Sequence, residues 1–288
     1  MAIWVDGDTR VMIQGITGRQ GRYHAARTME DHGRLVGGVV PGRGGASVVG
    51  VPVFDRVATC RAETGATASL VLVPPPAVYD AVDEAIEAGV SLIVVVTEHV
   101  PVLDSLRLVH RAAQQGVRLI GPNTIGIISP GLGKVGIMPV SLYRPGSVGI
   151  LSRSGTLTHE VASNLSACGI GQSTCIGVGG DSVVGTSFVD GLEQFRLDDQ
   201  TERIILIGEI GGHLEQEAAA YLEQGYPKPV HAYVAGRTAP PARRMGHAGA
   251  IVDGDSGQAS EKARAFEQAG VRVVSVADEL IAAIKEGQ

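Results

Sequence analysis

Short runs of β-branched and aliphatic residues alternate with amphipathic stretches along most of the chain. In the first half the predicted strands are Val11–Gln14, Leu35–Val39, Ser69–Val73, Leu92–Val96 and Arg118–Ile120. Apolar residues at helical spacing lie between them, for example in Val78–Ala88 and Leu103–Gln115. This alternation predicts an α/β fold with a doubly wound parallel sheet, because parallel neighbours need helical crossover connections.

The pattern lapses around residues 121–145, a stretch rich in glycine and proline, where we expect a link between two domains. A second series of strands follows at Val148–Leu151, Ser173–Val178, Ile204–Ile207, Val230–Val234, Ala250–Val252 and Val271–Ser275, and a helix near Asp278–Lys285 closes the chain. The expected division is therefore a first domain at 1–122, a linker at 123–145 and a second domain at 146–288.

The composition agrees with two α/β domains. A chain of 288 residues is long enough to bury two modest cores. Its hydrophobic content of 44% includes only 4% aromatic residues, so the apolar side chains are mainly the small aliphatic ones that buried parallel strands require. A net charge of −6 argues against a general nucleic-acid surface.

Three further observations concern the compartment. The three cysteines form no Cys-x-x-Cys pair, and an odd number suits a reducing compartment better than a disulfide framework. The N-terminus lacks the basic region and long apolar run of a signal peptide. No apolar run approaches the roughly 18 residues that cross a bilayer. We expect a soluble cytoplasmic protein that contacts neither membrane nor nucleic acid.

A glycine-rich loop follows the first predicted strand and precedes a helix. Gly15, Gly18 and Gly21 are spaced as G-x-x-G-x-x-G. Glycines let the backbone approach a phosphate closely, and a helix N-terminus offers free N–H groups with a partial positive charge. The loop predicts a site for a phosphorylated ligand.

The end of the second strand distinguishes among such ligands. A dinucleotide site has an acidic residue about 20 residues after the glycines, to hold the ribose 2′-OH. Here the strand runs into Val40-Pro41-Gly42-Arg43-Gly44-Gly45, with a cation and no acid. The Arg43 guanidinium suits an extra phosphate on the ribose, as in NADP or the 3′-phosphate of coenzyme A (CoA). The alternative is an ordinary solvated turn residue.

Two motifs in the second half have the chemistry of phosphoryl transfer. Ser154, Gly155 and Thr156 open a predicted helix directly after a strand, where hydroxyls and free N–H groups suit a dianion. Glu209 ends a predicted strand, where α/β folds place their sites, and its carboxylate can accept the N–H of an imidazole. The alternatives are a common Ser/Thr helix cap and a surface acid beside a turn.

His247 lies between two glycines in Gly246-His247-Ala248-Gly249. A histidine in a flexible loop is able to accept a phosphoryl group and deliver it elsewhere. The alternative is a loop histidine that caps a helix or lies in solvent, and the two motifs above favour the first interpretation. There is no Walker loop, so no nucleoside triphosphate site of the chain's own is visible. No zinc or other metal pattern is present either.

Several motifs together resemble one family. They are Gln14-Gly15-Ile16-Thr17-Gly18, Gly121-Pro122-Asn123, Ser152-Arg153-Ser154-Gly155-Thr156-Leu157-Thr158, Ile207-Gly208-Glu209-Ile210-Gly211-Gly212 and Arg244-Met245-Gly246-His247-Ala248-Gly249-Ala250-Ile251. Over nearly its whole length the chain resembles the α subunits of succinate–CoA ligases (succinyl-CoA synthetases), which are NDP-forming acid–CoA ligases. Motifs of this length in this order do not recur by chance.

The resemblance implies an N-terminal Rossmann-like CoA-binding domain followed by a flavodoxin-like, doubly wound ligase domain. It implies a β subunit of the ATP-grasp fold, in a heterodimer or heterotetramer, that binds ATP or GTP with Mg²⁺. In that scheme the reaction runs through an acyl phosphate and a phosphohistidine at His247, and CoA attacks the acyl carbon of the acyl phosphate and displaces phosphate. Phosphohistidine passes its phosphoryl group to a nucleoside diphosphate, or the reverse.

The resemblance also implies roles for individual residues. The CoA contacts are Thr17, Gly18, Arg19, Gln20, Arg43 (usually Lys in the family), Val96, Thr97 and Glu98. The phosphohistidine rests on Ser154, Gly155 and Thr156, with Glu209 orienting the ring.

The departures from the family pattern concentrate where the acid is expected to bind. Asn123-Thr124-Ile125-Gly126 stands where the family usually has Asn-Cys-Pro-Gly. His159 replaces a tyrosine that contacts the substrate, and Thr97-Glu98-His99 replaces Thr-Glu-Gly. We expect Asn123, Thr124 and His159 to contact a small dicarboxylate, which is succinate or a relative such as malate.

Two other classes of protein remain as alternatives. An NADP-dependent oxidoreductase explains the glycine loop and Arg43 but leaves His247 and Glu209 without a role. A non-catalytic CoA-binding or regulatory protein needs only the first domain and has no use for the histidine. Separate titrations with CoA and NADP, and phosphorylation of His247, distinguish these classes from a ligase.

Overall fold

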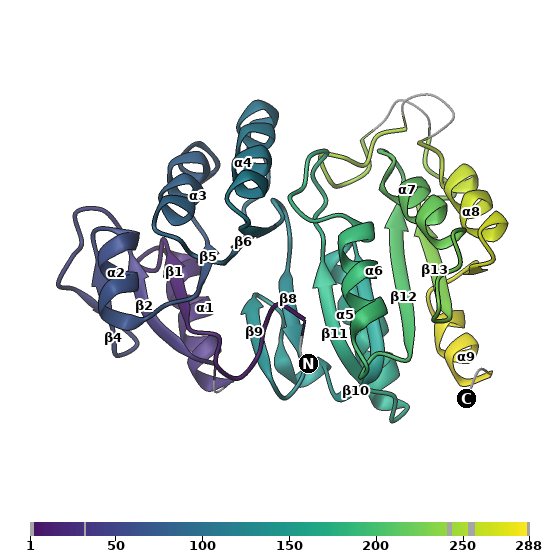
Figure 1. Ribbon diagram of the computed structural model, residues 1–288, viewed down its shortest axis with the longest axis horizontal. Coiled ribbons are helices and arrows are strands. Elements are labelled where there is room, and N and C mark those ends of the chain that lie inside the picture. Colours follow the sequence, from purple (N-terminus) through teal and green to yellow (C-terminus); the bar gives the residue numbers. More distant parts are fainter. Residues whose placement is uncertain (1–2, 32, 241–243, 253–256, 287–288) are drawn as a thin grey trace.

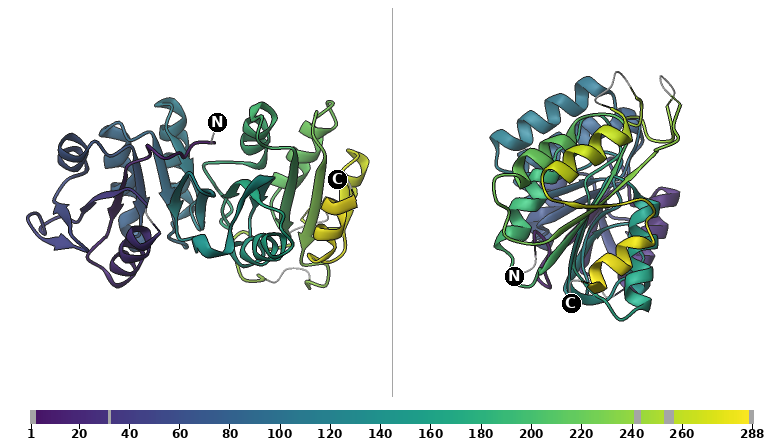
Figure 2. Two further views of the ribbon diagram at one scale, coloured as in Figure 1. Left: turned by 90° about the horizontal axis from the view of Figure 1, so that it is seen from below. Right: turned by 90° about the vertical axis from the view of Figure 1, so that its right-hand side faces the viewer.

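The computed structural model describes residues 3–31, 33–240, 244–252 and 257–286. This part of the chain forms two seven-stranded sheets, one from each half of the sequence, and both are covered by helices (Figure 1). The sheets lie side by side and give the molecule an elongated shape (Figure 2). Among the described residues, no helix is long and apolar enough to cross a membrane.

The first sheet has the strand order β3-β4-β2-β1-β5-β6-β7. Its strands are β1 (Val11–Gln14), β2 (Leu35–Val39), β3 (Ser47–Val48), β4 (Val51–Phe54), β5 (Ala68–Val71), β6 (Leu92–Val95) and β7 (Arg118–Ile120). All neighbours are parallel except β3 and β4, as predicted for a doubly wound sheet. Helix α1 (Arg19–Glu30) covers one face, and α2 (Val57–Thr64), α3 (Val78–Glu87) and α4 (Val102–Gln114) cover the other. A short 3₁₀ helix, η1 (Pro75–Ala77), leads into α3.

The second sheet has the order β14-β13-β12-β10-β11-β8-β9. Its strands are β8 (Gly126–Ser129), β9 (Gly133–Gly136), β10 (Pro145–Ser152), β11 (Gln172–Gly177), β12 (Arg203–Glu209), β13 (Val230–Ala235) and β14 (Arg272–Val274). Helices α5 (Gly155–Ala167) and α9 (Glu279–Glu286) pack on one face, together with the short 3₁₀ helix η2 (Val140–Leu142). Helices α6 (Phe188–Leu197), α7 (Leu214–Leu222) and α8 (Ala259–Gln268) pack on the other.

The structure differs from the sequence expectations at two elements. The stretch 123–145 contains the hairpin β8–β9, which extends the second sheet because β8 pairs antiparallel with β11. These strands are only four residues long and glycine-rich, so they show no period of their own. At Ala250–Val252 the structure has an isolated bridge between Ile251 and Arg244 in place of a sheet strand. The domain boundaries at 122 and 145 stay predictions.

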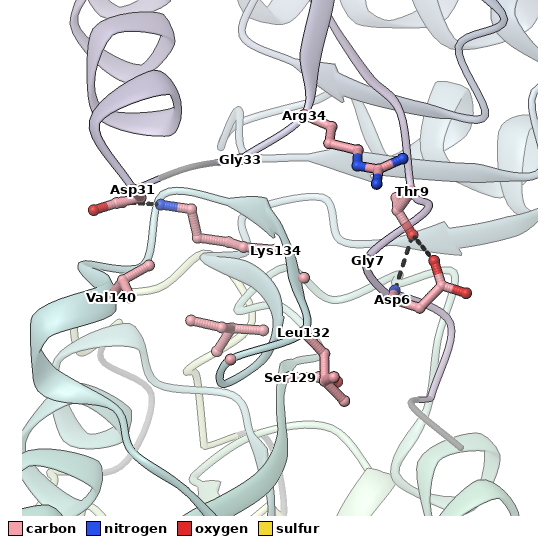
Figure 3. A pocket seen from close by; sticks show the side chains of 13 residues that line it. Asp6, Gly7, Thr9, Asp31, Gly33, Arg34, Ser129, Leu132, Lys134 and Val140 are labelled. Carbon is pink, nitrogen blue, oxygen red and sulfur yellow. Dashed lines mark hydrogen bonds and ion pairs between the residues drawn. The ribbon is translucent and has the colours of Figure 1, made fainter.

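The two halves are joined by an apolar cluster and by an ion pair. One hydrophobic cluster includes buried residues of both sheets, for example Ile13 of β1 and Ile127 of β8. Beside it, Lys134 of β9 reaches Asp31 at the end of α1, with 2.6 Å between nitrogen and oxygen. A pocket of about 350 Å³ opens at this junction, and none of the predicted site residues is among the described residues that line it (Figure 3).

Each sheet has one place where the order of its parallel strands reverses direction. In the first sheet β1 lies between β2 and β5, and in the second β10 lies between β11 and β12. Ligands of doubly wound sheets bind beyond the carboxyl ends of the strands at such places. The glycine loop follows β1, and Ser154–Thr156 and Glu209 come at the ends of β10 and β12, so the motifs lie where the topology favours a site.

Candidate active site

A pocket of about 820 Å³ opens at the carboxyl edge of the first sheet. Seven of the eight expected CoA contacts are among the residues that line it, namely Thr17, Gly18, Arg19, Gln20, Val96, Thr97 and Glu98. Residues predicted from two loops almost 80 positions apart therefore meet at one site, because β1, β5 and β6 are neighbours in the sheet. Thr97 is anchored there by its hydroxyl, which donates to the carbonyl of Val73 at 2.7 Å.

The glycine loop has the close packing that a phosphate site requires. Gly15 has φ +86°, and a Cβ there would lie 2.9 Å from the carbonyl oxygen of Leu72. A Cβ at Gly21 would lie 2.2 Å from the carbonyl oxygen of Gly15. Helix α1 begins after Gly18 with no side-chain cap, and the residues of its start, Gly18, Arg19, Gln20 and Gly21, line the pocket. The residues present therefore fit the pyrophosphate of CoA.

Arg43 lies in an exposed turn after β2, at the same edge of the sheet. Its backbone N–H donates to the carbonyl of Val40 at 3.1 Å. Arg43 is not among the residues that line the pocket, so its contact with CoA stays a prediction.

A second pocket, of about 190 Å³, opens between the two halves. Its lining includes His247 together with Gly155 and Thr156 at the start of α5. Val96, Asn123 and Ile137 line both this pocket and the larger one. The two pockets are therefore adjacent, and these three residues lie at the boundary between them.

His247 and Glu209 form the most direct contact of the predicted site. Nδ1 of His247 lies 2.9 Å from Oε2 and 3.1 Å from Oε1 of Glu209. The His247 side chain is 31% exposed and that of Glu209 only 10%. A hydrogen on Nδ1 donates to the carboxylate, which leaves the lone pair of Nε2 free to act as a nucleophile. The bond to Glu209 raises the pKa of His247, and burial opposes this only in part.

The loop that carries His247 packs against two glycines, Gly180 and Gly211, to which sequence reasoning assigned no role. A Cβ at Gly180 would lie 2.5 Å from Cγ of His247, and one at Gly211 would lie 2.1 Å from the carbonyl oxygen of Gly249. The N–H of Gly249 also donates to the carbonyl of Gly180 at 3.0 Å. The available signals were the glycine pairs after β11 and β12, which mark a close approach of the backbone.

The start of α5 combines a helix cap with residues that line a pocket. Ser154 is the helix cap, and its hydroxyl accepts the N–H of Leu157 at 3.4 Å. Gly155 and Thr156, in contrast, line the pocket of His247. The N-terminus of this helix therefore lies at the same pocket as the imidazole, and the partial positive charge of a helix N-terminus favours a bound dianion.

The three expected acid contacts have different surroundings. Asn123 donates from Nδ2 to Asp181 at 3.0 Å, and it lies between the two pockets. Thr124 lines the smaller pocket, but its hydroxyl donates to the carbonyl of Gly177 and accepts the N–H of Gly126. The hydroxyl hydrogen of Thr124 is therefore already used, which leaves a ligand the second lone pair of the oxygen and the methyl group.

His159 is directed elsewhere. Its Nδ1 lies 2.7 Å from the hydroxyl of Tyr143, and His159 is not among the residues that line the smaller pocket. Burial lowers the pKa of His159, so its ring is neutral near neutral pH. A direct contact of this side chain with the acid stays a prediction.

Comparison with known families divides the chain into the same two parts. Residues 6–99 match the family described as CoA binding domain, and residues 151–272 match the family described as CoA-ligase. The chain is 51% identical over 273 residues to a "Succinate--CoA ligase [ADP-forming] subunit alpha 2" of Archaeoglobus fulgidus, which covers 95% of each chain. It is 50% identical over 272 residues to the corresponding alpha subunit of Methanothermobacter thermautotrophicus, covering 94% of this chain and 92% of the relative.

Solved structures with low sequence identity share the fold. ATP citrate lyase from Methanothrix soehngenii, in complex with citrate and coenzyme A, matches 99% of this chain with a TM-score of 0.88 and 23% identity. The chain spans half of that longer protein. A dinucleotide-forming acetyl-coenzyme A synthetase from Ca. Korarchaeum cryptofilum matches 96% of this chain with a TM-score of 0.73 and 22% identity, and the match covers 60% of that protein.

Proposed function

Because the chain belongs to the family of succinate–CoA ligase α subunits, we propose that His247 carries the phosphoryl group of an NDP-forming acid–CoA ligase reaction. The observation that carries this proposal is the contact of Nδ1 with Glu209 in a pocket that the N-terminus of α5 also lines. An oxidoreductase or a purely regulatory CoA-binding protein has no use for this arrangement.

The residues of this chain have distinct tasks in the transfer. Glu209 accepts the hydrogen of Nδ1 and orients the ring, so that Nε2 attacks the phosphorus of an acyl phosphate and the P–O bond to the acid breaks. The free N–H groups near Gly155 and Thr156 stabilise the charge on the phosphoryl oxygens. The group then passes to a nucleoside diphosphate, and acyl-CoA synthesis runs these steps in reverse.

CoA fits the larger pocket of the first half. The glycine loop and the start of α1 hold its pyrophosphate, and Arg43 binds the 3′-phosphate. Bound CoA supplies the thiol that exchanges with phosphate at the acyl carbon. Asn123 and Val96 line both pockets, which is where an acyl group passing between thiol and phosphate would have to lie.

The triphosphate belongs on a partner. The relatives are named alpha subunits, and this sequence has no Walker loop. We propose a β subunit of the ATP-grasp fold that binds ATP or GTP with Mg²⁺, in an αβ or α₂β₂ assembly. The chain alone then binds CoA and has negligible ligase activity.

The acid is a small dicarboxylate, and the names of the relatives make succinate the first candidate. A ligase for a related acid such as malate is the second candidate. Thr124 and Ile125 favour it, because they line the pocket of His247 and depart from the Cys-Pro that the family usually has there.

The test of the phosphoryl carrier uses the complex co-purified with its β subunit. Incubation with ATP or GTP labelled at the γ-phosphate is expected to label this chain with acid-labile, alkali-stable phosphate. His247→Asn abolishes both label and turnover, because an amide does not act as the nucleophile. His110→Asn, at an exposed position of α4, is the matched control and keeps both. Full turnover in His247→Asn would overturn the proposal.

A further inference from the structure

A cluster of buried charges lies directly behind Glu209. Arg153 follows β10, Glu215 lies in the first turn of α7, and Lys262 lies in α8. Their side chains are 2%, 0% and 0% exposed, respectively. Sequence reasoning assigned no role to any of the three, and the phosphoryl transfer described above does not use them.

The cluster holds the backbone on both sides of Glu209. Oε1 of Glu215 accepts the N–H of Glu209 at 3.0 Å and lies 3.1 Å from Nη1 of Arg153. Lys262 forms an ion pair with Glu215 and donates to the carbonyl of Gly211 at 2.5 Å. Nη1 of Arg153 donates to the same carbonyl at 2.8 Å.

Arg153 is the member of the cluster that touches the catalytic carboxylate. Its Nη2 lies 3.4 Å from Oε1 of Glu209, on the other oxygen from the closest contact of His247. One planar guanidinium thus links the carboxylate that orients the imidazole with Gly211, against which the histidine loop packs. A lysine ammonium has no such fork and cannot make both contacts with the same geometry.

The charges of the cluster are balanced. Burial by itself would raise the pKa of Glu215, but Arg153 and Lys262 together lower it, so this carboxyl is ionised. Two cations therefore face the carboxylates of Glu215 and Glu209. Buried ions are costly to desolvate, so a buried ion cluster is weak evidence for a gain in stability. This cost argues that the arrangement around Glu209 has a use.

We propose that Arg153 is a positioning residue for phosphoryl transfer, which aims the Glu209 carboxylate at Nδ1 of His247 and so presents Nε2 to the phosphoryl group. The inference rests on the proposed function of His247. Arg153 lines the pocket of His247, but its side chain is 2% exposed and its contacts are with Glu209, Gly211 and Glu215, so we assign it a role through Glu209. Glu215 and Lys262 hold the guanidinium in place.

The test variant is Arg153→Lys in the complex with the β subunit. It keeps the buried positive charge but removes the planar guanidinium, whose two terminal nitrogens contact Gly211 and Glu209. We expect the initial rate of His247 labelling to fall by about 10- to 100-fold, the size of effect known for residues that orient metal-ligating side chains. The Kd for CoA stays the same. Arg118→Lys is the matched control, because Arg118 forms an ion pair with Asp190, with 2.9 Å between nitrogen and oxygen, and not with Glu209. This variant should leave the labelling rate unchanged.

A second measurement separates positioning from a purely structural role. With ¹⁵N-labelled histidine in the chain, the nitrogen shifts of His247 above its pKa report which ring nitrogen carries the hydrogen. We expect Nδ1–H to dominate in the wild type, and a mixture with Nε2–H in Arg153→Lys and in Glu209→Gln.

The outcomes are distinguishable. An unlabelled wild-type chain would refute the proposed function itself. A labelled wild type with an equal rate in Arg153→Lys, or an unchanged tautomer in that variant, would overturn the role of Arg153 alone.

Discussion

Nδ1 of His247 lies 2.9 Å from Oε2 of Glu209, although 38 residues separate the two in sequence. Glu209 ends β12, whereas His247 belongs to a loop that comes after β13. The contact raises the pKa of His247 above the ordinary 6.5. Only the neutral imidazole is a nucleophile, so in the proposed reaction this contact would both orient the ring and shift the pH range in which it reacts.

The first prediction concerns this pH dependence. In the wild type, labelling of His247 falls off on the acid side around a pKa above 6.5, because the ring is then protonated. Glu209→Gln removes the largest cause of the raised pKa, so the acid limb of the rate profile moves to lower pH. The plateau rate falls as well, since an amide holds Nδ1–H less firmly. Initial labelling rates of the wild type and Glu209→Gln, measured from acid to alkaline pH, test the shift of the acid limb and the fall of the plateau rate. An acid limb at the same pH in both proteins contradicts the prediction.

The same contact makes a stability prediction with a definite sign. The pKa of His247 is raised on folding, so the stabilisation is fully present below pH 6.5 and is lost as the pH rises through the folded pKa. Glu209→Gln should therefore lower the thermal midpoint more at mildly acid pH than at alkaline pH. Thermal unfolding of both proteins at the two pH values measures the difference, and a larger loss at alkaline pH is the opposite of what we expect.

Gly180→Ala tests whether the reaction needs the packing of His247 against Gly180. The new Cβ would lie 2.5 Å from Cγ of His247, so the ring or the loop must move. Overpacking of this kind costs about 1–3 kcal/mol. It therefore lowers the equilibrium constant between the packed and the displaced position of the His247 loop by about 5- to 150-fold. We expect the labelling rate to fall accordingly, with CoA affinity unchanged.

The control for this variant is Gly7→Ala, where the nearest atom lies 3.8 Å from the new Cβ. It should label like the wild type. Normal labelling in Gly180→Ala would show that the docked position of the ring is not needed for the reaction.

Arg43→Ala tests the site of the 3′-phosphate. We expect CoA binding to weaken by about 1.5–3 kcal/mol, the usual value of a hydrogen bond to a charged group, while dephospho-CoA is hardly affected. Arg34→Ala is the matched control, because Arg34 precedes the amino end of β2 whereas Arg43 follows its carboxyl end. Titration calorimetry with both ligands measures the effect. Equal losses for the two ligands would place Arg43 away from the 3′-phosphate.

The last prediction concerns the acid. We expect a substituted or differently sized dicarboxylate to be used at least as well as succinate. Thr124 and Ile125 line the pocket of His247, whereas the ring of His159 is bonded to Tyr143. The double substitution Thr124→Cys/Ile125→Pro should therefore change the ratios of kcat/KM among acids more than His159→Tyr does.

The assay compares succinate, malate, itaconate, glutarate and sulfur analogues with the wild-type complex and both variants. If succinate leads clearly and neither variant alters a ratio, the altered pocket is refuted. If His159→Tyr alone changes the ratios, the acid contacts His159, and the bond to Tyr143 must open when it binds.

Much of the fold follows from local patterns. The strands of the first sheet from Val11 to Ile120 are apolar and flanked by helical periodicity, and a parallel arrangement needs little else. The hairpin β8–β9 was missed because its strands are short and glycine-rich, and they are stabilised by pairing with β11 rather than by their own pattern. A strand was expected at Ala250–Val252, but in the structure this run flanks the loop of His247 and forms only an isolated bridge.

The sequence by itself determined the chemistry of the candidate site, because the residue types of a phosphate loop, a helix N-terminus and a phosphoryl carrier are recognisable one motif at a time. Only the tertiary structure decided which groups meet. It brought Glu209 to His247, occupied the hydroxyl of Thr124, and turned His159 toward Tyr143. It also buried Arg153, Glu215 and Lys262 behind the carboxylate. These contacts join strands and helices that are distant in sequence, and a hydrogen bond between such elements depends on packing that no local pattern encodes.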